Sequence, residues 1–337
     1  MAASHWLGDP PADRERLAAW ALSRVAATAA EDVHVDAVVD IVHAARDART
    51  DLGGRFGGCE VGEPDAGQAE ERRRFRLDGI SPRRLREEDC DEPWAALFDP
   101  ARLVRGIATV RNVRRGREWV ELVLTPHAAF AAPADAWLPP GACDLVVRVD
   151  TATGFLLSAT VVDEQGPLVT GRISGLAIRD TSPSPADAGR VLARMARTLV
   201  EPARLTADVR IETDTHTDLS TTPVPSVRSW TVSCGTETLT VTGDYAPDRT
   251  SPAAARLAEL LAPARIVSHL AHVEATSPAS ITATVRPLRS FPLSAWAPDE
   301  SLTCRFTVDR TTGVLLYAEA TEGDHTLFRH VVTSLGP

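Results

Sequence analysis

The sequence predicts an α+β protein built from two repeated, curved antiparallel β-sheets, or half-barrels, each with an N-terminal helix and a short inserted helix. Its 337 residues exceed the usual size of one domain and favour two. The segments "VDTATGFLLSA" from Val149 and "VDRTTGVLLYA" from Val308 are nearly the same, although they lie 159 residues apart. Most other apolar segments alternate apolar and polar residues, as half-buried strands do.

The similarity between the two halves extends well beyond this pair of segments. Residues 136–176 align with 295–335 without a gap, and twelve of the forty-one pairs are identical. Upstream, "LFDPARLVRGIATV" matches "LLAPARIVSHLAHV", and "PPADRERLAAWALSRV" resembles "SPADAGRVLARMARTL". These matches predict two domains, 1–180 and 186–337, joined by a polar, proline-rich linker.

Each half begins with a predicted helix, because apolar residues recur at helical spacing after a proline-rich start. Leu17, Ala21 and Val25 share one face in the first half, and Val191 and Met195 do so in the second. Strands follow in both halves, and "DPARLV" and "APARIV" predict short helices between strands, with proline in the first turn. The predicted strands include "VHVDAVVDIVH", "RRFRLDG", "WVELVL" and "DLVVRVD", then "RLTADVRIETD", "WTVSCG", "TLTVTGD", "SITATVRP" and "LTCRFTVD".

One segment has no counterpart in the second half. Residues near 51–73 combine glycine clusters with many charges. Such a segment has little apolar surface to offset the entropy lost on ordering. It therefore predicts a mobile insertion in the first domain.

The repeated hairpin is explained by the chemistry of its turn. Asp150 and Asp309 can accept hydrogen bonds from backbone N–H groups two residues further on. Gly154 and Gly313 supply the positive φ that the chain needs before the next strand. We therefore expect each copy of the motif to close one sheet rather than to carry catalysis.

The order of helix, antiparallel meander, helical insertion and final "V-D-x-x-T-G-x-L-L-x-A" hairpin resembles the LolA/RseB/LppX group of lipoprotein-carrier-like half-barrels. The resemblance implies a sheet curved around helices, with acyl chains or a partner segment held in the apolar space between them. Residues 1–20 lack the features of a signal peptide, and no run approaches 18 apolar residues. The expectation is therefore a cytoplasmic form that is not inserted in a membrane.

The composition excludes several classes of function. A formal net charge of −10 opposes binding to nucleic acid. All 36 basic residues are arginine, so lysine Schiff bases and P-loop nucleotide sites are ruled out. The five cysteines lack C-x-x-C spacing and are expected to be small buried residues rather than disulfide or zinc partners. G-x-S-x-G, H-E-x-x-H and G-x-G-x-x-G are absent, and neither a cofactor nor a metal is expected.

The alternation of the strands selects candidate site residues on the inner faces of the sheets. The candidates for acid/base catalysis are Glu118, at a strand entrance, and His330, which replaces Gly171 of the first half. An inward ionisable group is costly to bury unless it is paired or functional. The candidates for ligand binding on the same faces are His43, Phe75, Trp230 and Phe328.

The sequence leaves three functions open. The first is a cytoplasmic binding protein that holds a small hydrophobic or amphipathic molecule in a half-barrel cavity. The second is a cofactor-free cyclase or other enzyme of natural-product biosynthesis, in which Glu118 and His330 perform acid/base chemistry. The third is a scaffold that binds a partner protein along a sheet edge. A purely apolar tunnel would favour the first, a closed pocket with a Glu–His pair the second, and a filled core with an exposed apolar groove the third.

Overall fold

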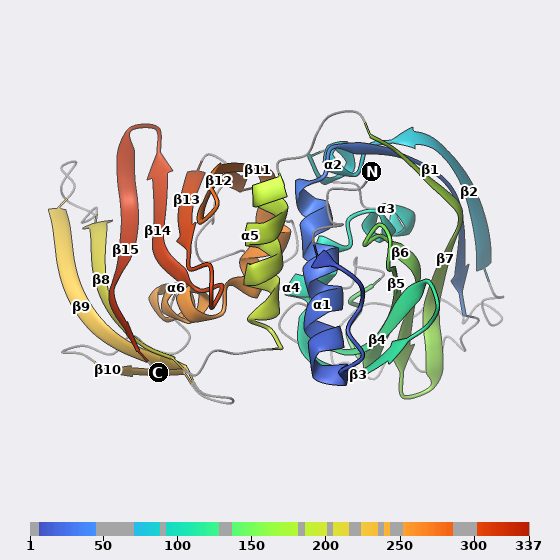
Figure 1. Cartoon of the computed structure of the whole chain (residues 1–337), viewed down its shortest axis with the longest axis horizontal. Helices are drawn as coiled ribbons and strands as arrows, with labels where there is room; N and C mark the ends of the chain where they lie inside the picture. Colours follow the sequence, from blue (N-terminus) through green and yellow to red (C-terminus); the bar gives the residue numbers. More distant parts are fainter. Residues whose placement is uncertain are drawn as a thin grey trace, which may run out of the picture.

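The protein has two antiparallel sheets with helices between them, as the α+β prediction requires (Figure 1). The computed structural model describes residues 7–44, 71–87, 92–127, 137–180, 186–200, 205–215, 224–234, 239–242, 252–285 and 302–336. Within these ranges one sheet has seven strands and the other eight, and neither closes into a barrel. We call the first sheet with helices α1 to α4 the first unit, and the second sheet with α5, α6 and η4 the second unit.

The first unit begins with α1, whose first turn is capped by the Asp13 carboxylate. The short helices α2 to α4 lie between the second and third strands, and the predicted "DPARLV" helix corresponds to α4. The elements are α1 (Arg14–Ala27), η2 (Thr28–Ala30), β1 (Val33–His43), β2 (Glu71–Ile80), α2 (Pro82–Glu87), α3 (Pro93–Leu97), α4 (Ala101–Arg105), β3 (Ile107–Arg115), β4 (Trp119–Pro126), β5 (Asp144–Asp150), β6 (Leu156–Asp163) and β7 (Gly166–Asp180).

The second unit follows the same order of elements. Its predicted "APARIV" helix is the 3-10 helix η4, preceded directly by the longer α6. The elements are α5 (Ala186–Arg197), β8 (Leu205–Thr215), β9 (Val224–Cys234), β10 (Leu239–Thr242), α6 (Pro252–Leu261), η4 (Pro263–His269), β11 (Leu270–Ser277), β12 (Ser280–Val285), β13 (Leu302–Val308), β14 (Leu315–Glu322) and β15 (His325–Gly336).

The strands of the two sheets correspond one to one, apart from the additional β10. The first sheet has the order β2-β1-β7-β6-β5-β4-β3, and the second has the order β10-β9-β8-β15-β14-β13-β12-β11. Each final strand, β7 or β15, returns to pair with the strand that follows the N-terminal helix. In both sheets this pairing brings the two ends of a unit together.

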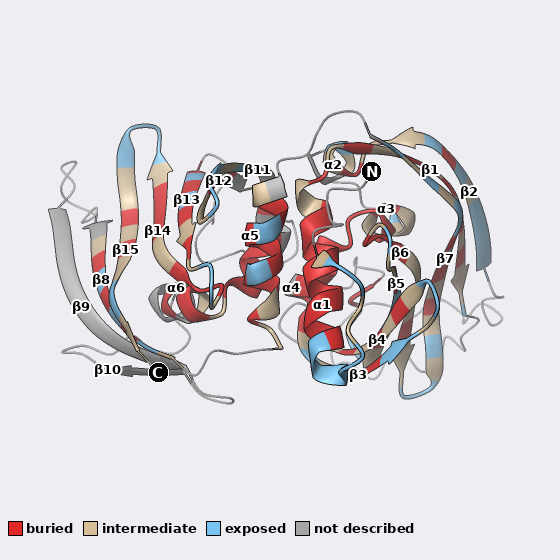
Figure 2. Cartoon of the chain, viewed as in Figure 1, coloured by how far each residue is buried: buried red, intermediate tan, exposed pale blue. Residues whose placement is uncertain are grey.

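Alternating side chains of the strands form the inner faces of the sheets. In β1 every second residue from Val33 to Ile41 is buried, as the sequence predicts. The same alternation occurs in β4 and β13. Figure 2 shows that the buried positions gather on the central helices and on alternate strand residues, whereas exposed residues occur on the edge strand β2 and in the connection between β14 and β15.

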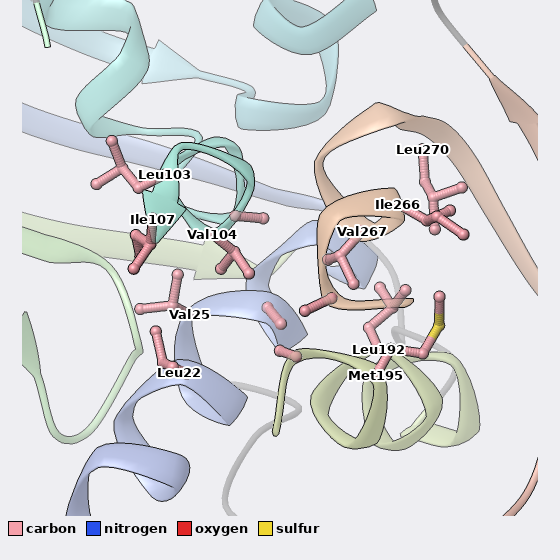
Figure 3. Close-up of a cluster of buried hydrophobic side chains, with 14 of the residues drawn as sticks. Leu22, Val25, Leu103, Val104, Ile107, Leu192, Met195, Ile266, Val267 and Leu270 are labelled. Atoms are coloured by element: carbon pink, nitrogen blue, oxygen red, sulfur yellow. The ribbon is translucent and has the colours of Figure 1, made fainter. Parts of the chain in front are cut away.

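The two units meet through equivalent helices. Helix α1 packs against α5, and α4 packs against η4. Figure 3 shows Leu22 and Val104 of the first unit in one buried cluster with Leu192, Met195 and Val267 of the second. These residues belong to a single hydrophobic core that continues from one unit into the other.

The repeated turn has the predicted geometry in both units. The carboxylate of Asp150 accepts hydrogen bonds from the backbone N–H of Thr153 at 2.7 Å and from its hydroxyl at 2.8 Å. Asp309 makes the same two bonds with Thr312, at 2.9 and 2.5 Å. The glycine that follows has φ of 83° in the first turn and 80° in the second.

Part of the expected mobile insertion is a regular strand. Glu71 and Arg73, at the end of the predicted 51–73 segment, lie in β2 and pair with His43 and Ile41 of β1. Their charged side chains lie on an edge strand, where most of them are exposed, and the mobility of the segment stays a prediction. Residues 51–70 lie outside the described part of the chain.

Candidate functional site

His330 and Phe328 lie together on the inner face of the second sheet. Both belong to β15, two residues apart, so their side chains lie on the same face. His330 is fully buried, and Phe328 is 8% exposed. Their inward placement agrees with the alternation of the sequence.

Two other predicted site residues, His43 and Phe75, lie in the first unit. His43 and Phe75 are half-buried in the first unit, and the Phe75 ring lies 6.2 Å from that of Trp94. Trp230 is in β9, opposite Val209, but its side chain lies outside what the structure describes. The predicted residues are therefore split between the two units.

The inward placement of Glu118 was wrong. This residue is exposed and precedes β4, which begins at Trp119. Its backbone carbonyl accepts a hydrogen bond from Thr151 N–H at 3.0 Å. Alternation applies only within the strand, so it does not extend to a residue in the connection. Cys143 is likewise exposed rather than buried, whereas Cys304 is buried as expected.

Helix α6 brings Arg256 close to the pair on β15 and Glu259 close to Cys304 on β13. The Arg256 guanidinium carbon lies 4.4 Å from the centre of the Phe328 ring, a cation–π contact. Arg256 and Glu259 are three residues apart and therefore lie on one side of the helix. Together with Cys304 on β13 they form what we call the polar cluster: Arg256, Glu259, Cys304 and His330.

Burial is the largest cause of the pKa shifts in the polar cluster. It lowers the pKa of His330 to about 3, assisted by the positive charge of Arg256. It also lowers the pKa of Arg256 itself, against the attraction of Glu259. Burial and the Glu259 charge raise the pKa of Cys304 to about 12. At neutral pH the cluster therefore contains a neutral imidazole and a neutral thiol beside an arginine and a glutamate.

The first unit has apolar packing at the equivalent place. Gly171 corresponds to His330, and a Cβ added to it would lie 2.7 Å from the Trp137 ring and 2.8 Å from Leu97. Trp137 is 2% exposed, and its indole N–H donates to the Pro93 carbonyl at 2.7 Å. Glycine is thus required here by the close approach of a large ring.

A neighbouring row of inward residues also differs between the sheets. It runs across four strands in the same register in both units. The first three members are smaller in the second sheet, and the fourth is larger. The row is Leu124, Leu145, Val161 and Val169 in the first sheet, and Ala283, Cys304, Ala320 and Phe328 in the second.

Sequence reasoning missed Arg256 and Glu259. The matched segments place Ala96 opposite Glu259 and Pro93 opposite Arg256, so both charges occur in one half only. The presence of a polar residue in one half only is the same observation that singled out His330. It was overlooked because alternation identifies strand faces, whereas the face that α6 buries depends on how the helix packs on the sheet.

The described residues contain neither a candidate metal site nor a candidate membrane-spanning helix. No group of three or more His, Cys, Asp or Glu side chains in this part of the chain is arranged to hold a metal ion. None of the helices within the described ranges is both long and apolar enough to cross a lipid bilayer.

Comparisons with known proteins give only weak similarity. No protein-family model matches the chain. No curated protein matches it either. Among solved structures, the complex of Pseudomonas aeruginosa MucA and MucB is similar at 12% sequence identity and a TM-score of 0.24, over 95% of this chain and 98% of that chain.

Proposed function

We propose that this protein binds a small amphipathic molecule between α6 and the inner face of the second sheet. In this proposal the two sheets are half-barrels of one duplicated pair, as the resemblance to the LolA/RseB/LppX group implies. The observation that carries it is the polar cluster, which occupies a place that the first unit fills with apolar side chains. The cytoplasmic location stays a prediction.

The lining of the second sheet supports an apolar ligand body. Ala283, Cys304 and Ala320 replace three larger residues of the first sheet, whereas Phe328 and His330 are larger than their counterparts Val169 and Gly171. Phe306 and Phe328 supply aromatic surface beside them. Pockets for small molecules combine such apolar walls with a few convergent polar groups.

The charges of the cluster favour an uncharged polar head group. Arg256 and Glu259 have opposite charges, and His330 is neutral because its pKa lies at about 3. A further full charge would add a desolvation cost without a free counter-charge in the cluster. An alcohol, ketone or amide can exchange hydrogen bonds with these side chains at a lower cost.

Binding is better supported than acid/base catalysis. A general base works best when its pKa lies near the working pH, and a pKa of about 3 makes His330 a weak one. Glu118, the predicted partner in catalysis, is exposed in the first unit, so no Glu118–His330 pair forms.

The proposal is tested with 1-decanol as a neutral probe and decanoate as its anionic counterpart, by calorimetric titration of the full chain at pH 7. We expect decanol to bind more tightly than decanoate. Phe328→Ala removes an aromatic wall and should weaken decanol binding by about tenfold or more. The matched control is Val169→Ala, the equivalent position of the first sheet, which should leave the affinity within about twofold of the unaltered protein.

Equal losses in the two variants would place the binding outside the second sheet and contradict the proposal, as would the absence of decanol binding. Native mass spectrometry of the purified protein provides an independent readout. A retained molecule that is lost in Phe328→Ala but kept in Val169→Ala supports the same site.

A further inference from the structure

A cavity lies at the boundary between the units, apart from the polar cluster. It has a volume of about 430 Å³ and opens between α5, the turn that follows β13 and the N-terminal part of the chain. Leu7 and Ser23 of the first unit contribute to its wall. Its volume lies within the range of pockets that bind small molecules.

Arginine dominates the charged lining of this cavity. Arg190, Arg194 and Arg197 come from successive turns of α5, and Arg310 comes from the repeated turn. The lining contains four arginines and two aspartates, which leaves two positive charges in a chain whose formal net charge is −10. A concave site with an excess of one charge concentrates the field and attracts ligands of the opposite charge.

The two aspartates are already engaged by the protein. Asp187 pairs with Arg190 at 3.5 Å. The Asp309 carboxylate accepts two hydrogen bonds from Thr312 within the turn. Burial raises the pKa of Asp309, but these hydrogen bonds and the positive charge of Arg194 outweigh it, so the pKa is lowered. Asp309 therefore stays ionised at neutral pH, and the lining keeps its excess of arginine.

Arg24 of the first unit is equivalent to Arg194 of the second unit but makes different contacts. Gly154 packs against the Arg24 carbonyl of α1, just as Gly313 packs against the Arg194 carbonyl of α5. The Arg24 guanidinium is buried and donates to the carbonyls of Thr151 and Ala152 at 2.7 and 3.0 Å. In the first unit Arg24 of α1 thus binds the carbonyl groups of the repeated turn in the same unit.

Arg194 has a different environment from Arg24. It is exposed and lines the cavity. Arg190, one helical turn before it, is exposed as well. The same helix-and-turn contact therefore presents arginines to a solvent-accessible cavity in the second unit only.

We propose that this cavity binds a small soluble polyanion with two or more phosphate or carboxylate groups. Guanidinium groups match such oxygens geometrically and can donate two hydrogen bonds to one group. Arg194 and Arg310 approach the cavity from the helix and from the turn, so one ligand can engage both. The proposal is independent of the ligand proposed for the polar cluster.

The test uses inorganic tripolyphosphate and calorimetric titration of the full chain at low ionic strength. The double variant Arg194→Gln with Arg310→Gln should weaken binding by about tenfold for each arginine, roughly a hundredfold in total. Arg172→Gln with Arg305→Gln is the matched control, because these two arginines are also exposed but do not line the cavity. It should change the affinity by less than about threefold, and the affinity of the unaltered protein should fall as salt is added.

Three outcomes would overturn the proposal. They are no tripolyphosphate binding, equal weakening in both double variants, and binding to phosphatidylglycerol vesicles without binding to tripolyphosphate. Decanol titration of the Arg194/Arg310 variant should give an unchanged affinity, so a failure of this site is distinguishable from a failure of the proposed function.

Discussion

Single residues explain why the hairpin motif occurs twice. Gly154 and Gly313 are needed for their positive φ, but each also lies against the backbone of the N-terminal helix of its unit. A Cβ on Gly154 would be 2.8 Å from the Arg24 carbonyl oxygen, and one on Gly313 would lie closer still to that of Arg194. The motif therefore fixes a turn and also docks it onto a helix.

Because Gly154 and Gly313 have both roles, replacing either with alanine should cost more stability than replacing a glycine that has only a positive φ. A positive φ alone costs a residue with a side chain about 1–2 kcal/mol. Gly141→Ala has only that cost, because φ is 85° there and nothing lies within 4 Å of the added Cβ. Gly154→Ala and Gly313→Ala should lower the free energy of unfolding by more than Gly141→Ala does, as measured by urea titration. Equal losses at the three positions would show that the helix contact is unimportant.

The buried His330 predicts a characteristic dependence of stability on pH. Its pKa is about 3 in the folded protein, against an ordinary value of 6.5. The unfolded chain therefore binds a proton between these values that the folded chain does not, so the neutral imidazole favours folding above pH 6.5. This contribution falls as the pH is lowered towards 3, by up to about 1.4 kcal/mol per pH unit.

His330→Phe removes that dependence. The variant should lose less stability than the unaltered protein between pH 6.5 and 4, in urea titrations at several pH values. Arg256, Glu259 and Cys304 face the same space and are unchanged in this comparison. His325→Gln is the control, because this histidine lies on the same strand but is exposed. Parallel profiles for all three proteins would contradict a buried neutral His330.

At the scale of elements, the N-terminal helices hold each sheet to its partner unit. Helix α1 is buried along most of its length, and the Ser23 hydroxyl donates to the Ala193 carbonyl of α5 at 3.2 Å. The start of α1 is fixed by the Asp13 carboxylate, which accepts from Glu15 N–H at 2.8 Å and Arg16 N–H at 3.2 Å. The negative charge also favours this end of the helix dipole.

Asp13→Ala should lower the free energy of unfolding by about 1 kcal/mol, because two backbone donors lose their acceptor. Asp13→Asn keeps an oxygen acceptor and should lose only a fraction of that amount in the same denaturation experiment. If the two substitutions were equally harmless, the cap would contribute nothing to the stability of the helix.

At the scale of the whole molecule, the core passes from one unit to the other. Leu22 and Leu192 belong to the cluster between α1, α4, α5 and η4, and both are almost completely buried. Equivalent helices meet across this boundary, an arrangement similar to the self-complementary interface of a two-fold dimer. We infer that the two units unfold together.

Weakening this boundary should separate the two units. The unaltered protein is expected to show one thermal transition, and the double variant Leu22→Ala with Leu192→Ala two. Each Leu→Ala change in a core costs about 2–5 kcal/mol. Leu145→Ala, on the inner face of the first sheet, is a control that should lower the transition temperature without splitting it. Two transitions already present in the unaltered protein would contradict the inference.

The predicted boundary between 180 and 186 can be examined with the same proteins by proteolysis.

The sequence by itself determined the features that depend on neighbouring residues. Alternation placed Val33 to Ile41 and the pair Phe328 and His330 on inner faces, and turn chemistry explained Asp150 and Gly154. The existence of two similar halves followed from the internal match alone. These features are local, since the strand period and the turn geometry depend on a few consecutive residues.

Only the tertiary structure decided how the elements pack on one another. It brought Arg256 of α6 close to Phe328 and His330, and it placed Gly313 against Arg194, although these residues are far apart in the chain. It also excluded Glu118, which lies just outside a strand and is exposed. Such contacts depend on which face each helix buries and where the sheet curves, and these are properties of the whole core rather than of any short segment.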